Sequence, residues 1–377
     1  MTRFDVIVIG AGPVGSYTAY QLADRGFSVC ILEQKRTAGQ DVICAGVVSK
    51  AAFKRYDLPT TSILSRISSV SFVSPLGRRL EYEPDEIFSY VIDRKDFDGK
   101  LLRLARKFGA KVGLRHQVHR ITESNNTYTV HTDRKKCRAR AVVIATGVQA
   151  DLAQQAGLSR PQKFLYGAQI EMPYPCKRTH VEIHLGQNFT PGSFGWVIPS
   201  HSGHARIGTI ISRRGKTYLK KLLTDRLDIS AKNLDAMKIK RIACGPVKRS
   251  VRGNVLSVGE AAGQIKTTTG GGIFYGLLCS EIAVDKLVKT LKKGKNLQDY
   301  EITWRSALIS ELDIGIRLRK IAEQLSDDDI ENLFTFVKKN RFWVELLVPR
   351  IDFDYHSNVI FFCIKSFGAL LKLPNTE

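Results

Sequence analysis

The pattern Gly10-x-Gly12-x-x-Gly15 constrains the fold of this chain more than any other feature of the sequence. An apolar stretch predicts a buried strand over residues 5–9, directly before the pattern, and helical periodicity predicts a helix over 16–25, directly after it. In such a unit the first glycine permits a tight turn, the second lets the backbone approach a pyrophosphate, and the third lets the helix pack on the strand. The pattern therefore predicts a dinucleotide-binding β-α-β unit of the Rossmann type.

Glu33 extends this pattern, because it stands at the end of the next predicted strand, over 27–32. A carboxylate at this position accepts hydrogen bonds from a ribose hydroxyl and repels a 2′-phosphate, which argues against NADP. Two later strands favour FAD over NAD: a strand over 141–145 ends at Thr146-Gly147, and a strand over 254–258 ends at Gly259-Glu260. FAD is the longer molecule, and its ribitol hydroxyls need an acceptor from the far end of the sheet, a role that suits Glu260.

The rest of the chain predicts an α/β fold: a Rossmann-like FAD-binding domain with an inserted antiparallel β-sheet substrate domain and a helical C-terminal region. Strand pairs are expected at 70–82 and 117–130, a helix at 96–108, antiparallel strands over 163–212, helix plus strand over 216–241, and a long helix over 273–291. We expect a discontinuous FAD-binding domain at 1–60, 93–160 and 245–300, a β-rich substrate-binding domain at 61–92 and 161–244, and the helical region at 301–377.

Four segments resemble one family of flavoproteins. The segment GEAAGQIKTTTGGGIFYG at 259–276 resembles the signature of the geranylgeranyl reductase family. GQDVICAGVVS at 39–49 resembles that family's cysteine loop, and VIDRKDFD at 91–98 resembles its arginine motif. TPGSFGWVIP at 190–199 resembles its aromatic substrate motif. The resemblance implies the fold of p-hydroxybenzoate-hydroxylase-like flavoproteins, FAD, and reduction of isolated double bonds in the polyprenyl chains of lipids or quinones.

Candidate site residues follow from these segments. The helix after Gly270-Gly271-Gly272 would aim its N–H groups at the pyrimidine end of a flavin, and the glycines would let the backbone lie against the ring. The resemblance falls on Cys44 as the candidate catalytic residue, either a proton donor to the alkene or a residue that shapes the pocket. The expected cofactor-binding residues are Gly10, Gly12, Gly15, Glu33, Arg94, Gly147, Gly259, Glu260, Gly263, Gly270, Gly271 and Gly272. The expected substrate-binding residues are Phe194, Trp196, Pro199, Phe274 and Tyr275, whose aromatic rings would form one apolar slot.

The charge of the chain indicates the partners. Lys and Arg exceed Asp and Glu by 58 − 36 = +22, so the surface attracts polyanions. The basic run at 134–140 has no interleaved aromatic residues, so we expect no nucleic acid. We expect an acidic electron donor, ferredoxin or flavodoxin. NAD(P)H is the alternative donor, and it is less favoured because this chain has Thr146-Gly147 where many relatives have Asp-Gly.

The expected location is the cytoplasm, with peripheral contact to a membrane. No secretory signal or long apolar span stands in the sequence, and the seven cysteines are scattered without a Cys-x-x-Cys pair. An apolar tail at 359–372 is expected either to lie on a bilayer or to dock on the core. His201 and His204 are expected in a hairpin turn, with no metal site.

Two rival functions stay open on the sequence alone. Phe194-x-Trp196-x-Ile-Pro199 partly resembles a halogenase motif, which would make the protein a flavin-dependent monooxygenase or halogenase acting on an aromatic. A flavin-binding electron carrier is the other rival, and it predicts no substrate cavity beside the flavin.

Overall fold

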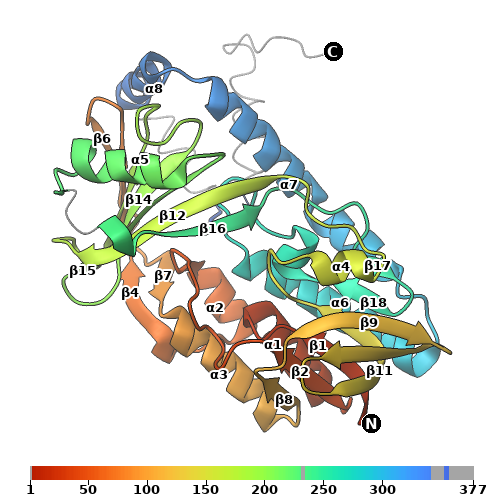
Figure 1. The fold of residues 1–377 in the computed structure, drawn as a ribbon. Coiled ribbons are helices and arrows are strands. Elements are labelled where there is room, and N and C mark those ends of the chain that lie inside the picture. Colours follow the sequence, from red (N-terminus) through yellow and green to blue (C-terminus); the bar gives the residue numbers. More distant parts are fainter. Residues whose placement is uncertain (1, 231–233, 341–351, 356–377) are drawn as a thin grey trace, which may run out of the picture.

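The computed structural model describes residues 2–230, 234–340 and 352–355 (Figure 1). The glycine pattern lies where the sequence predicts, between strand β1 (Arg3–Ile9) and helix α1 (Pro13–Asp24), and β2 (Val29–Glu33) follows. Strand β1 pairs in parallel with β2 on one side and with β11 (Lys136–Ile144) on the other. The helix begins three residues earlier than expected because Pro13 occupies its first turn, where proline is favoured.

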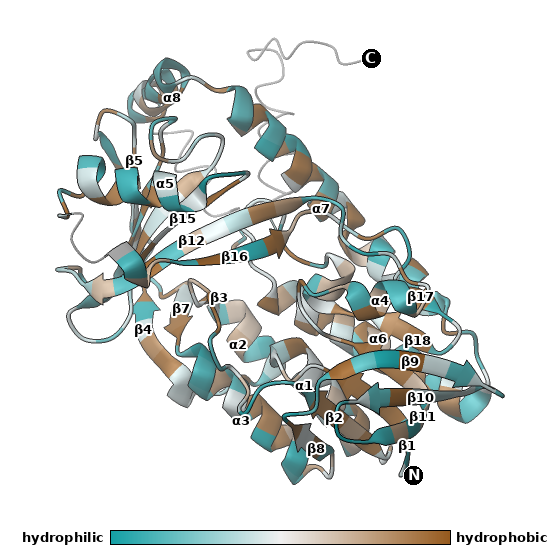
Figure 2. Cartoon of the chain, viewed as in Figure 1, coloured by the Kyte–Doolittle hydropathy of each residue, from teal (hydrophilic) through white to brown (hydrophobic). Residues whose placement is uncertain are grey.

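The first sheet has the order β17-β18-β11-β1-β2-β8, with the hairpin β9–β10 attached to β11. Its remaining strands are β8 (Lys111–Leu114), β9 (Val118–Ser124), β10 (Thr127–Thr132), β17 (Val251–Arg252) and β18 (Val255–Ser257). Val6 and Val8 of β1 pack among the helices α1, α3 (Arg94–Lys107) and α6 (Ile273–Lys293), whereas Ile7 and Ile9 pack toward the hairpin and α4 (Asp151–Gln155). Figure 2 shows hydrophobic residues concentrated where β1 and β2 meet these helices.

The second sheet is the inserted one, with the order β16-β12-β15-β14-β13-β5-β6. Its strands are β5 (Ser69–Val73), β6 (Arg79–Tyr82), β12 (Phe164–Pro173), β13 (His180–His184), β14 (Phe194–Pro199), β15 (His204–Ile211) and β16 (Lys238–Ala243). All neighbours are antiparallel except β5 and β13, which run parallel and so depart from the purely antiparallel sheet that the sequence predicts. One face packs on α5 (Gly215–Lys221) and the π-helical turn Leu222–Arg226, and the other packs on the loop that contains Ala45.

A small third sheet, β3-β7-β4, and the C-terminal helices complete the described chain. The small sheet joins β3 (Val47–Ser49), β4 (Ile63–Ile67) and β7 (Ser89–Ile92), and α2 (Lys50–Tyr56) follows β3. Helix α7 (Asp299–Gln324) spans the two large sheets, because Trp304 donates to Ser250 beside β17 and Arg319 donates to Ser193 beside β14 (Figure 1). Helix α8 (Asp327–Lys339) begins with a capping box and lies at the far end of the second sheet (Figure 1).

The predicted α/β class is confirmed. Short 3₁₀ turns lie at Thr60–Ser62, Leu234–Ala236 and Gly259–Ala262. Within the described ranges, none of the helices combines the length and apolar character needed to cross a bilayer. The apolar tail at 359–372 lies outside the described residues.

Candidate active site

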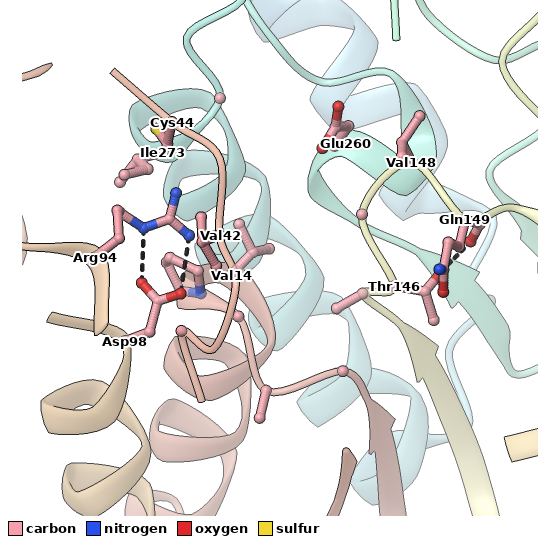
Figure 3. A pocket seen from close by; sticks show the side chains of 18 of the residues that line it. Val14, Val42, Cys44, Arg94, Asp98, Thr146, Val148, Gln149, Glu260 and Ile273 are labelled. Atoms are coloured by element: carbon pink, nitrogen blue, oxygen red, sulfur yellow. Dashed lines mark hydrogen bonds and ion pairs between the residues drawn. The ribbon is translucent and has the colours of Figure 1, made fainter. Parts of the chain in front are cut away.

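One cavity of about 660 Å³ holds most of the predicted site residues. It lies at the carboxyl ends of β1, β2 and β11, where ligands bind in open parallel sheets. The cysteine loop and the first turn of α3 meet at Cys44 and Arg94 in its wall (Figure 3), and strand β16 and the glycine triplet also line it. Phe353 and Asp354, from the C-terminal region, also line it.

The three glycines of the first pattern have three different environments. Gly10 has φ +105°, and a Cβ there would lie 2.4 Å from the carbonyl oxygen of Ala145. A Cβ on Gly12 would meet no atom within 4 Å and would enter the cavity that Gly12 lines. A Cβ on Gly15 would lie 2.1 Å from the carbonyl oxygen of Gly10, so Gly15 is a helix-to-strand contact that does not line the cavity.

Glu33 lies in the cavity wall at the end of β2 with its carboxylate fixed by two backbone donors. The N–H of Ala11, inside the glycine pattern, donates to Glu33 Oε2 at 2.8 Å, and the N–H of Lys35 donates to Oε1 at 2.9 Å. The carboxylate thus has a set position beside Gly10 and Gly12, as a ribose acceptor requires.

Glu260 also lines the cavity, and it pairs with a residue that the sequence did not single out. Lys240, on β16 of the second sheet, lies with Nζ 3.1 Å from Glu260 Oε2 and lines the cavity itself. The N–H of Ala243 donates to Glu260 Oε1 at 3.4 Å. A Cβ on Gly147 would lie 3.6 Å from Glu260 Oε2, so the ends of β11 and β18 meet here, as their order in the sheet predicts.

The glycine triplet forms the wall that leads into α6. Gly270, Gly271 and Gly272 all line the cavity, and Gly272 is the N-cap of the helix. The other two glycines of this segment have packing roles: the N–H of Gly259 donates to the Gln264 side chain at 2.7 Å, and a Cβ on Gly263 would lie 2.1 Å from the carbonyl oxygen of Gly245. Neither Gly259 nor Gly263 lines the cavity.

Cys44 faces the cavity beside Arg94 (Figure 3). Arg94 is the first residue of α3 and forms a two-pronged ion pair with the buried Asp98, at 2.8 and 2.9 Å. Burial by itself would raise the pKa of the Cys44 thiol, but Arg94, Lys240 and the N–H of Gly46, 3.3 Å from Sγ, together lower the pKa below its usual value. A thiol with a lowered pKa gives up its proton more readily than an ordinary cysteine.

The aromatic candidates do not come together in one slot. Phe274 lines the cavity and packs with Tyr275 in the core of the first domain, where the hydroxyl of Tyr275 donates to the carbonyl of Asp354 at 2.8 Å. Phe194 and Trp196 pack in a separate cluster on the cavity-side face of the second sheet, with Ala45 among their neighbours. Pro199, Trp196, Phe194 and Tyr275 do not line the cavity.

The structure adds a buried ion pair that sequence reasoning missed. Lys266, four residues before Gly270 in the loop that precedes the triplet, has Nζ 2.7 Å from Asp354 Oδ1, and both residues line the cavity. Burial lowers the pKa of Lys266, and Asp354 opposes that effect. The available signal in the sequence was two aspartates alternating with aromatic residues at 352–355, which matches no motif of the family.

These residues fit a dinucleotide that carries a flavin ring. The fixed carboxylate of Glu33 suits a ribose, and the open backbone at Gly12 suits a pyrophosphate. Glu260 and the glycine-lined start of α6 complete the lining. His201 lies in the turn between β14 and β15, and His204 is the first residue of β15. No group of metal-binding side chains is found in the part of the chain that the structure describes.

Comparisons with known proteins identify related oxidoreductases. Residues 7–153 match the family described as pyridine nucleotide-disulphide oxidoreductase, and residues 82–238 match the family described as FAD dependent oxidoreductase. Digeranylgeranylglycerophospholipid reductase 2 of Methanothermobacter thermautotrophicus is 29% identical over 352 residues, which cover 88% of this chain and 91% of that protein.

Solved structures share the fold. A geranylgeranyl bacteriochlorophyll reductase-like protein from Thermoplasma acidophilum aligns with a TM-score of 0.83 at 21% identity, over 98% of this chain and all of the other (100%). A myxobacterial chondrochloren halogenase aligns with a TM-score of 0.68 at 16% identity, over 94% of this chain and 92% of the halogenase. Because a reductase-like protein and a halogenase share this fold, the fold alone does not select between their reactions.

The fold and the site define a flavin-dependent oxidoreductase. The reductase relatives narrow the comparison: the chain is similar to the digeranylgeranylglycerophospholipid reductases along most of its length, and four of its segments resemble motifs of the geranylgeranyl reductase family of flavoproteins. The monooxygenase or halogenase alternative is not favoured.

Proposed function

We propose that the protein is an FAD-dependent reductase that saturates carbon–carbon double bonds in the polyprenyl chains of a membrane lipid or quinone. The observation that carries this proposal is the convergence of Cys44, Arg94 and the glycine triplet on the cavity that also contains Gly12 and Glu33. The digeranylgeranylglycerophospholipid reductases, to which 88% of the chain aligns, are named for such a lipid.

The cofactor would lie along the cavity. We propose that Glu33 accepts from the adenosine ribose, that the backbone at Gly10 and Gly12 approaches the pyrophosphate, and that Glu260 accepts from the ribitol. The flavin ring would then lie between the glycine triplet and Cys44. FAD, when bound and reduced, supplies the hydride for one alkene carbon.

The chain itself must supply the proton for the other alkene carbon. We propose Cys44 Sγ as the atom that holds this proton, because the thiol faces the cavity from a loop whose neighbouring residues, Ala45 and Gly46, are small. Arg94 steadies the thiolate that remains after the transfer, and Asp98 fixes the orientation of the guanidinium. Gln169 Nε2 donates to the Cys44 carbonyl at 3.4 Å and helps hold the loop.

We propose that the substrate enters from a membrane surface. We also propose that the electrons come from an acidic carrier protein. The net charge of +22 favours both an anionic lipid surface and a small acidic protein such as ferredoxin or flavodoxin over a neutral partner. NAD(P)H is the less favoured donor because Thr146 stands where many relatives have an aspartate.

Anaerobic reoxidation of the reduced protein tests the reaction. Protein reduced by light, without oxygen, should regain its oxidised flavin absorbance when a geranylgeranyl lipid is added, and a fully saturated lipid is the matched control. Flavin that stays reduced with the unsaturated lipid, yet reoxidises in air with an aromatic substrate that becomes hydroxylated or halogenated, would replace the proposal with the monooxygenase or halogenase function.

A further inference from the structure

A buried pair of opposite charges lines the end of the cavity that the proposed function assigns to the flavin ring. The side chains of Lys266 and Asp354 are 7% and 3% exposed, and Lys266 Nζ lies 2.7 Å from Asp354 Oδ1. The ammonium group also donates to the carbonyl of Phe353 at 2.6 Å and lies 4.5 Å from the centre of the Phe353 ring. Phe353 and Asp354, in the short described stretch 352–355, thus bring the C-terminal region to the cavity.

Lys266 is the member of the pair that adjoins the glycine triplet. Its N–H donates to the carbonyl of Gly271 at 2.9 Å, and its own carbonyl accepts from the N–H of Gly270 at 2.8 Å. A Cβ on Gly271 would lie 3.8 Å from Lys266 Cδ. Asp354 lies on the other side, where Ser49 donates to Oδ2. The Lys266 backbone and the stem of its side chain therefore adjoin the triplet, its ammonium group lies at Asp354 and Phe353, and Asp354 in turn contacts β3.

Stability alone is a weak explanation for this pair. Removing two charges from water costs about as much as their attraction returns, and apolar residues of similar size usually stabilise such a position equally well or better. Loss of one partner, in contrast, leaves a buried unpaired charge and is strongly destabilising. A buried cation beside a flavin can stabilise the reduced form, because reduction adds negative charge to the flavin. The low local dielectric strengthens the attraction between the cation and that negative charge.

We propose that Lys266 faces the cofactor and stabilises the negative charge of the reduced flavin, and that Asp354 is a positioning residue that holds the Lys266 ammonium group beside the glycine triplet. This inference rests on the proposed function, because it needs a flavin ring at the triplet. The start of α6 at Ile273 contributes partial positive charge at the same place.

Two variants and one control separate the electrostatic role from a structural one. Lys266→Met removes the cation and leaves Asp354 unpaired. The double variant Lys266→Met/Asp354→Asn removes both charges, so the fold has no buried unpaired charge. The control is Asp285→Asn/Lys289→Met, which removes the same two charges from an exposed ion pair further along α6.

The measurements are the thermal unfolding temperature, the affinity of the apoprotein for oxidised flavin, and the midpoint potential of the bound flavin without any lipid. We expect Lys266→Met to unfold at a lower temperature, and the double variant to recover most of that loss. In the double variant the dissociation constant of reduced flavin should rise about tenfold more than that of oxidised flavin, a change that lowers the two-electron potential by about 30 mV, and in Lys266→Met the potential should fall at least as far because the Asp354 carboxylate remains. The control should match the parent in all three measurements.

The outcome for the double variant decides the question. A potential that returns to the parent value together with stability would overturn the inference, because Lys266 would then act only through the fold, and an unchanged potential in Lys266→Met would overturn it as well. An apoprotein that binds no flavin at all would overturn the proposed function first, and the inference with it.

Discussion

Gly12 offers the sharpest separation between folding and cofactor binding. Gly12 has φ −69° and ψ 179°, an extended conformation that valine readily adopts, and a Cβ there meets no protein atom within 4 Å. Gly12→Val therefore leaves the fold intact, because the loss of glycine entropy in the unfolded chain, worth about 0.4–1 kcal/mol, offsets the poorer capping of α1 by valine. The added side chain fills cavity space where we propose the pyrophosphate approaches the backbone.

The cost to flavin binding follows from overpacking. Forcing a group into occupied space costs about 1–3 kcal/mol, which weakens binding by roughly 5- to 150-fold, and the protein should purify with less flavin than the parent. Flavin absorbance per mole of protein and a titration of apoprotein with FAD measure the loss, and thermal unfolding measures the fold.

Gly15→Ala is the matched contrast, because its Cβ would lie 2.1 Å from the carbonyl oxygen of Gly10. This variant should unfold at a clearly lower temperature than the parent. Full flavin content in Gly12→Val would refute the placement of the cofactor, and a large loss of stability in Gly12→Val would refute the reasoning from open space.

Three further predictions concern the reaction. Cys44→Ala should bind FAD and accept electrons normally but reduce the alkene more slowly, by about 10²–10⁴-fold as for other lost general acids, and equal turnover in single-turnover assays would remove the thiol from the proton path. Lys240→Met should raise the pKa of the Cys44 thiol, so that its alkylation by iodoacetamide begins at higher pH, whereas Lys238→Met on the same strand, outside the cavity lining, should have little effect. Reduction by an acidic carrier should slow steeply with added salt, since the Debye length is only about 8 Å at physiological ionic strength, and salt-independent reduction by NAD(P)H would argue for that donor instead.

Sequence reasoning found the parts of the site that depend on short-range patterns. A glycine at a fixed place after a strand, an acid at the end of the next strand, and a glycine triplet before a helix each leave a local signature, and Gly12, Glu33 and Gly271 accordingly line one cavity. The arginine of the α3 motif was found in the same way. Its partner Asp98 is one helical turn further on and was within reach of the same reasoning.

The parts that sequence reasoning missed depend on contacts between distant segments. Lys240 reaches Glu260 only because β16 of the second sheet lies over the end of β18, and nothing near Lys240 in the sequence indicates this. Lys266 and Asp354 are also far apart in the sequence and form their ion pair only in the folded chain. The aromatic residues failed for a related reason: their types predict burial, but Trp196 and Phe274 belong to different cores, which a pattern of residue types does not distinguish.

The most direct measurement of the central claim is the mass of polyprenyl lipids and quinones extracted from cells with and without the gene. We predict that one lipid or quinone class from cells with the gene is heavier by two hydrogens, or by a multiple of two, than the same class from cells without it. Expression of the Cys44→Ala variant should leave that class largely unsaturated. Identical lipid and quinone masses with and without the gene, in cells that contain the flavin-loaded protein, would contradict the account.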